Sequence, residues 1–197
     1  IGSATGGDVT VTNAIAISGT TSEVTAALVT GSSKVIASTA TVTLNDLANV
    51  DLLASDLTAI GSSTGGQVSV SNAVNITGTV AEINLALVTD SSKVVLSSGT
   101  TTVKATGVGS SSDLSSVTQG GVLTAELVDG GNISTNNDLS TVDVFVIENG
   151  GSVTMTIAQQ NLLSATGNGG TNTVTLSNGN VAFTGIASVE DHVLARG

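Results

Sequence analysis

The stretch IGSATGGDVTVTNAIAISGTTSEVTAALVTGSSKVIASTATVTL, residues 1–44, recurs as IGSSTGGQVSVSNAVNITGTVAEINLALVTDSSKVVLSSGTTTV, residues 60–103. The two copies are identical at 25 of 44 positions, and their offset is 59 residues. A fixed offset of this kind indicates a repeat architecture, in which each copy packs on its neighbours. We therefore divide the chain into repeat 1–59, repeat 60–118 and a divergent β-rich segment 119–197, all forming one continuous structure.

Each copy contains the signals for strands and one short helix. Apolar residues alternate over 9–17 and again over 68–76, a pattern that predicts half-buried strands. A Thr-x-x-Glu sequence follows, and it begins at Thr20 in the first copy and at Thr79 in the second. The apolar residues behind it have helical spacing, so we expect a capping box that opens a short helix.

The end of each predicted helix is marked by Ser-Ser-Lys, with Lys34 and Lys93 at equivalent positions. Because two of the four basic residues fall there, we expect these lysines to support a corner of the fold. A second recurring corner is an apolar residue, two small residues and a valine, often followed by an acid. It occurs at 47–51, 114–118, 139–143 and 186–190.

The last third of the chain is richer in strand signals. We predict strands at 142–147, 152–157, 172–177 and 181–183, with Asn-Gly turns at 149–150 and 178–179. A short helix at 158–165 interrupts them. Together these patterns predict a mainly β fold, a parallel β-solenoid with short helical turns at its corners. The alternative is a tandem of β-sandwich adhesin domains, but two Phe and no other aromatic residue make sparse cores for sandwiches.

Composition excludes several classes of function. The chain has no Cys, so it holds no disulfide and no thiolate metal site. Four basic residues against 15 acidic ones, with almost no aromatic side chains, do not suit nucleic-acid binding. No apolar run is long enough for a transmembrane helix. An acidic, Thr/Ser/Gly-rich chain of this kind is common among secreted bacterial surface proteins.

The segment DLSTVDVFVIENGGSVTMTIAQQNLLSATGNGGTNTVTLSNGNVAFTGIASVEDHVLARG, residues 138–197, carries a family resemblance. It resembles repeat modules of large secreted bacterial surface proteins, both S-layer-like proteins and giant adhesins, which often neighbour repeats-in-toxin calcium rolls. The first two repeats share only the general style. The resemblance implies secretion to the cell surface, a structural or adhesive role, and calcium as a candidate cofactor.

Calcium binding is only weakly indicated by the residues themselves. The nearest approach to the calcium-roll nonapeptide is residues 167–175, where Asn168 replaces a Gly and Asn172 replaces the ligating Asp. Asp51, Asp143 and Glu190 recur at one position of the corner motif, and they are the candidate metal ligands if corners stack. The alternative is that an acid or hydroxyl at this position caps the corner backbone.

No catalytic constellation is evident, and we expect the chain not to be an enzyme. His192, the only histidine, follows two acids but has no Ser or Cys nucleophile motif to serve. A carbohydrate-binding or carbohydrate-active β-helix is an alternative, yet such sites need clustered acids, bases and aromatic platforms. Ice binding is a further alternative. Thr-x-Thr pairs recur, but their spacing along the chain is too irregular to predict a regular row of aligned pairs.

The sequence therefore predicts a structural, extracellular or cell-surface protein of bacterial type. It would form part of a surface layer, a matrix filament or an adhesin stalk, and it would self-associate through its ends. Its expected partners are further copies of itself, as a homo-oligomer or filament, with a cell-surface glycan as a further candidate.

Overall fold

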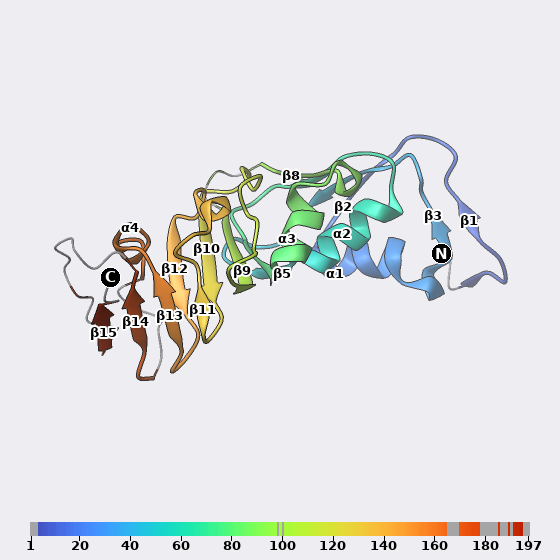
Figure 1. Ribbon diagram of the computed structural model, residues 1–197. Coiled ribbons are helices and arrows are strands. Elements are labelled where there is room, and N and C mark those ends of the chain that lie inside the picture. The colour runs from blue at the N-terminus through green and yellow to red at the C-terminus, as the bar shows by residue number, and fades with distance from the viewer. Residues whose placement is uncertain are drawn as a thin grey trace. The chain divides into compact units, whose positions relative to one another are not determined.

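The computed structural model describes residues 4–97, 99, 101–164, 170–177, 185, 189 and 191–194 (Figure 1). The chain forms two compact units, residues 1–103 with 117–121 and residues 104–116 with 122–197. Helices account for 24% of the structure and strands for 33%. The strands form several small parallel sheets, and much of the intervening chain in the first unit is helical.

The first unit alternates strands with helical turns. Its strands are β1 (Val9–Thr10), β2 (Ala16–Gly19), β3 (Val35–Ile36), β4 (Thr41–Leu44), β5 (Asp51–Leu53), β6 (Val68–Val70), β7 (Asn75–Thr79) and β8 (Val94–Leu96). Its helical elements are α1 (Thr21–Val24), the π-helical turn η2 (Thr25–Val29), the 3-10 turn η3 (Gly31–Ser33), α2 (Ala54–Ser63), α3 (Val80–Leu87) and the 3-10 turn η4 (Asp90–Ser92).

Strands of the first unit pair in parallel at a nearly constant separation along the chain. The sheet β2-β4-β6-β8 aligns Val42 with Val68 and Val68 with Val94, 26 residues apart in each case. β1 pairs with β3, and β5 pairs with β7. Parallel neighbours need a crossover connection, and helical turns occupy several of these crossovers. Equivalent positions of successive segments, about 26 residues apart, thus lie side by side in the sheets.

Helix α2 is the central helix of the first unit. It contacts η2 on one side and α3 on the other, as the row of coils in Figure 1 shows. Leu57 and Ile60 are fully buried. Gly61 lies so close to η4 that a Cβ there would be 2.7 Å from the carbonyl carbon of Ser92 and would overlap its oxygen. Only glycine fits this helix against the turn.

The second unit has shorter connections. Its strands are β10 (Val122–Leu127), β11 (Gly131–Asn132), β12 (Val144–Ile147), β13 (Ser152–Met155), β14 (Thr173–Leu176) and β15 (Asp191–Leu194); β9 (Thr102–Val108) begins in the first unit and enters the second. Its helical elements are the 3-10 turn η5 (Asn137–Leu139) and α4 (Ile157–Gln160). Paired residues lie 18 to 22 positions apart, as in Val174 with His192 and Gly131 with Val153.

Burial alternates along these strands as the period-2 pattern requires. In β13 and β14, Val153, Met155, Val174 and Leu176 are at most 3% exposed, and the residues between them are more exposed. Phe145 is the largest fully buried side chain described. Val, Ile, Leu and Ala supply almost all of the remaining apolar core, so the sheets pack with almost no aromatic residue.

The predicted mainly β solenoid is wrong, and so is the alternative of tandem sandwiches. Several small parallel sheets mix with helices in an α/β-like arrangement, and no sheet forms a solenoid. Sandwich domains consist of antiparallel sheets, whereas these sheets are parallel. The reason for the error is local: the apolar segments after the caps form complete helical turns that pack together, rather than short corners.

Several predicted elements are confirmed. Thr20 and Thr79 each cap a helix in a full capping box with Glu23 and Glu82. The helix expected at 158–165 is shorter and begins earlier, as α4. The strand expected at 181–183 and the turn at 178–179 lie outside the described residues. Helix α2 was not predicted at all.

Candidate functional site

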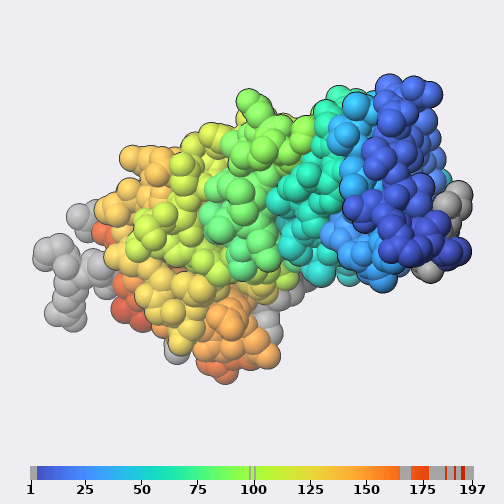
Figure 2. All heavy atoms as spheres, turned by 90° about the vertical axis from the view of Figure 1, so that its right-hand side faces the viewer, coloured from blue at the N-terminus to red at the C-terminus, as the bar shows by residue number. Residues whose placement is uncertain are grey.

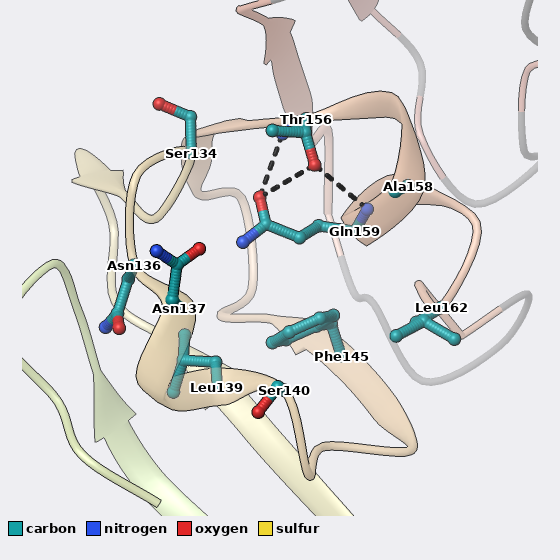
Figure 3. Close-up of a pocket in the computed structure, with 10 residues that line it drawn as sticks. All are labelled: Ser134, Asn136, Asn137, Leu139, Ser140, Phe145, Thr156, Ala158, Gln159 and Leu162. Atoms are coloured by element: carbon teal, nitrogen blue, oxygen red, sulfur yellow. Dashed lines mark hydrogen bonds between the residues drawn. The ribbon is translucent and has the colours of Figure 1, made fainter. Parts of the chain in front are cut away.

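A pocket of the second unit is built on two helical turns and one strand (Figure 3). One side is positioned by Asn136, which is the N-cap of η5. Its side-chain oxygen accepts a hydrogen bond from the Asp138 amide at 2.9 Å. Its side-chain nitrogen donates to the carbonyls of Ser112 at 2.8 Å and Gly109 at 3.3 Å. Asn136 is 9% exposed, and it fixes the turn to the preceding loop.

The opposite side is positioned by the capping box of α4. The Gln159 side-chain oxygen accepts from the Thr156 amide at 2.9 Å and from the Thr156 hydroxyl at 3.1 Å, as the dashed lines in Figure 3 show. The Gln159 side-chain nitrogen donates to the Ile133 carbonyl at 2.8 Å. This glutamine therefore joins the start of α4 to the segment that leads into η5.

The pocket between these sides has a volume of about 500 Å³. It is lined by hydroxyl, amide and apolar side chains: Ser134, Asn136, Asn137, Leu139, Ser140, Phe145, Thr156, Ala158, Gln159 and Leu162. Figure 3 shows the Asn137 amide directed toward Gln159, with Phe145 below. Since none of these side chains is charged, the pocket offers no general acid, no general base and no metal ligand set.

Phe145 is the aromatic residue in the lining of the pocket. Its ring is 1% exposed, because it packs into the core beneath the pocket. A sugar-binding platform needs an exposed aromatic face, so this arrangement does not favour the carbohydrate alternative. Sequence reasoning missed the pocket residues. The signal was present in Thr156-x-x-Gln159, which has the same capping-box spacing as the two Thr-x-x-Glu sequences.

Of the three candidate metal ligands, the structure describes two, one in each unit. Asp51, in the first unit, is exposed and accepts a hydrogen bond from the Asn75 side chain at 3.0 Å. Asp143, in the second unit, accepts from the Leu123 amide at 2.8 Å. Glu190 lies outside the described residues. Both described carboxylates thus bind donors from the chain segment that pairs with their own, a side-chain amide at Asp51 and a backbone amide at Asp143.

Asp46 is the most buried carboxylate described, at 8% exposed. It accepts from the Thr21 amide with both oxygens, at 2.9 and 3.1 Å, and from the Thr21 hydroxyl at 2.6 Å. With Asp51 and Asp56 it lines a shallow hollow between α1 and β5. Even so, nowhere in the described part of the chain do three or more His, Asp or Glu side chains gather as a metal site. Asp46 instead anchors the start of α1 to the next segment.

Lys34 and Lys93 have the same structural role in the two repeat copies. Both adopt a left-handed backbone conformation, with φ of 52° and 57°, which ends the 3-10 turn before them. The Lys34 ammonium donates to the Thr5 carbonyl at 2.9 Å, and that of Lys93 donates to the Gly61 carbonyl at 3.0 Å. These contacts confirm the corner role predicted from their equivalent positions.

Most carboxylates with a shifted pKa also support the backbone. Hydrogen bonds from the Thr20 amide and hydroxyl lower the pKa of Glu23, and those from Thr79 lower the pKa of Glu82 in the same way. The pKa of Asp129 is lowered by the Ser152 amide and hydroxyl of the neighbouring strand. Each shift has a local donor as its cause and lies on an exposed group, so none indicates a catalytic acid or base.

Other predicted site residues are placed only in part. His192 lies on β15 and aligns with Val174 of β14, while its neighbour Glu190 is outside the described residues. Residues 167–169 of the degenerate nonapeptide 167–175 are also outside them, and Asn172 is fully buried. No helix among the described segments is long and apolar enough to cross a membrane.

Comparison with known proteins gave no match to any family model, to any curated protein or to any solved structure. Function must therefore be inferred from the residues and their geometry.

Proposed function

We propose that the chain is a structural repeat protein of a bacterial cell surface, a part of a surface layer, matrix filament or adhesin stalk. The observation that carries the proposal is the use of its charged residues. Lys34 and Lys93 occupy equivalent positions of the two copies, and each donates to a backbone carbonyl of an earlier segment, 29 and 32 residues away. Glu23 and Glu82, also equivalent, each accept from the amide that begins their own helix. Because two of the four basic residues tie separate segments of the chain together, the arrangement favours a structural role.

Two further features support this proposal. An acidic, Cys-free composition rich in Thr, Ser and Gly is common among secreted bacterial surface proteins. The pocket beside η5 and α4 has no charged lining residue, and Asn136 and Gln159 in its lining hold the surrounding loops. We also propose that the chain self-associates through its ends, because each copy in a repeat protein buries its apolar face on a neighbouring copy.

The test combines assembly with location. Sedimentation velocity and negative-stain microscopy on the full chain, over a wide range of concentration, should show assemblies that grow with concentration. Antibody labelling of intact source cells should detect the protein without permeabilisation. Compact monomers at every concentration would overturn the assembly part, and labelling only after permeabilisation would overturn the surface location. Parallel samples with calcium and with a chelator determine whether calcium contributes.

A second candidate function, ice binding, has one observation in its favour. The register of the β13–β14 pair places Ser152 beside Thr173 and Thr154 beside Thr175. Residues two apart on a strand are about 6.6 Å apart, and neighbouring strands are about 4.8 Å apart, so these four hydroxyls form a small regular array. Thermal hysteresis of the full chain, and its loss in Thr154→Lys, would support this function. Absence of hysteresis in the native chain would exclude it, and the array would remain a cross-strand packing feature.

A further inference from the structure

The internal repeat allows the same surface to be compared in two surroundings. Ile15 in the first copy is 39% exposed, whereas its equivalent in the second copy, Val74, is 1% exposed. Similarly, Val11 is partly exposed and Val70 is 1% exposed, although both are in strand-forming runs of the same sequence. The two copies therefore have the same apolar face, buried in the second and more open in the first.

The segment between the copies covers the face of the second one. β4 pairs with β6 in parallel, and the Ala40 carbonyl accepts from the Gly66 amide at 3.1 Å. The Leu44 carbonyl accepts from the Ser71 amide at 3.0 Å. The Asn72 side chain donates to the Asp46 carbonyl at 2.7 Å. Residues 38–59 thus satisfy the backbone groups at this edge and bury the apolar residues beside them.

The paired glycines show how close this contact is. A Cβ on Gly66 would be 2.9 Å from the Ala40 carbonyl carbon and would overlap its oxygen, and a Cβ on Gly65 would overlap the Ser38 carbonyl oxygen. The equivalent Gly6 and Gly7 of the first copy have nothing within 4 Å of such a Cβ. Gly6 and Gly7 therefore leave room for a closely packed backbone, and no described residue occupies that room.

We propose that this first-copy face, defined by Gly6, Gly7, Val9, Val11 and Ile15, docks a further copy of the repeat. The part of that copy that would contact the face is the segment equivalent to residues 38–59. The argument is the chain's own second copy, in which that segment lies on the equivalent residues. Figure 2 shows the first copy, in blue, at the surface of the first unit.

The hydrogen-bond donors for the occupant are also identifiable. The amides of Gly7 and Thr12 are equivalent to those of Gly66 and Ser71, which donate to residues 40 and 44. Asn13 is exposed and is equivalent to Asn72. Two hydrogen bonds would be missing, because Ala16 stands where the second copy has Asn75, which donates to the Asn49 carbonyl and the Asp51 carboxylate. The inference rests on the repeat construction of the proposed function, but not on its cell-surface location.

The decisive experiment adds one copy of residues 1–59 directly in front of Ile1 in the full chain. The new junction reproduces the natural junction between Ala59 and Ile60. Amide hydrogen exchange followed by NMR should then slow by roughly tenfold or more at Gly7 and Thr12, since those amides gain backbone acceptors. Unchanged exchange at both amides in a fusion whose added copy is folded by circular dichroism would overturn the proposal.

A glycine substitution provides the matched control. Gly7→Ala should leave the thermal midpoint of the original chain unchanged, because its Cβ meets open space. In the fusion the same substitution should lower the midpoint and restore fast exchange at Thr12, as expected for a site like Gly66. An equal effect in both chains would refute the proposed contact. The fusion can pass this test even if the original chain does not assemble or is not at the cell surface, so the two proposals fail independently.

Discussion

Gly61→Ala tests the close packing of helix α2 on the turn η4. In an isolated helix this change would stabilise by about 1 kcal/mol, because Ala has the better helix propensity. Here the new Cβ would be 2.7 Å from the Ser92 carbonyl carbon and 3.0 Å from its Cα. The turn cannot easily retreat, since the Ser92 hydroxyl donates to the Ala86 carbonyl at 2.6 Å and its amide donates to the Thr89 carbonyl at 3.0 Å.

The steric cost should therefore exceed the propensity gain. Overpacking of this kind costs about 1–3 kcal/mol and more against fixed backbone, so we expect a net loss of about 2 kcal/mol. For a chain of this size that corresponds to a fall in Tm of roughly 4–8 °C. Far-UV circular dichroism is the assay, because the chain has no Trp or Tyr to report by fluorescence.

Gly31→Ala is the control for the glycine substitution itself. Gly31 begins a 3-10 turn in the same unit and has nothing within 4 Å of an added Cβ. We expect its effect to stay within about 0.5 kcal/mol. A Tm for Gly61→Ala that equals or exceeds that of the native chain would refute the reasoning, because it would mean that α2 does not lie against Ser92.

Three further predictions concern the charged and capping residues. Lys93→Met should lower the free energy of unfolding by about 1–2 kcal/mol, since it removes two charge-assisted hydrogen bonds to backbone carbonyls. The control, Lys104→Met, breaks an ion pair near the surface and should lower it by at most about 1 kcal/mol. Equal losses in urea denaturation would contradict the role given to Lys93. Thr79→Ala should cost about 1 kcal/mol while Thr79→Ser is tolerated, and a similar loss for both would argue against the cap. Because the folded pKa of Glu82 is below its ordinary value, its contribution is present at neutral pH and is lost as pH falls below 4.5 through the folded pKa. Glu82→Gln should therefore flatten the acid limb of the stability–pH curve, and an unchanged limb would exclude this contribution.

Local signals in the sequence predicted the parts of the fold that depend on local interactions. The Thr-x-x-Glu boxes could be recognised because a cap and its helix lie within a few residues. Lys34 and Lys93 could be assigned to corners because the repeat places them at the same point. The corner at Leu47 to Val50 is also formed, with the Val50 amide donating to the Leu47 carbonyl at 3.3 Å.

Helix α2 could not be predicted in this way. Its N-cap is Leu53, which provides no side-chain hydrogen bond, and its last turn contains Gly61 with two serines. Intrinsic propensity is therefore poor, and the helix depends on packing against η2 and α3. Because the helical part of the chain was underestimated, the fold was assigned to a mainly β class.

The candidate site shows the same limit. Gln159 was noticed only as part of a helix, although its side chain bridges to Ile133, 26 residues earlier. Thr154 and Thr175 are 21 residues apart in sequence and side by side in the sheet, so the spacing of the threonine pairs along the chain concealed their alignment. Contacts of this kind depend on the separation between paired strands, which the repeat length of 59 does not reveal.

The near-constant separation between paired strands has a consequence for how the chain folds. The strand pairs of known register join residues only 18 to 26 positions apart. Closing loops of this size costs little more entropy than closing much shorter ones, and no such pairing waits for a distant part of the chain. Parallel sheets usually form slowly because their contacts are non-local, but these can form one after another as the polypeptide lengthens. A chain still emerging from the ribosome or from a pore could therefore bury each new strand as soon as about 26 further residues have appeared.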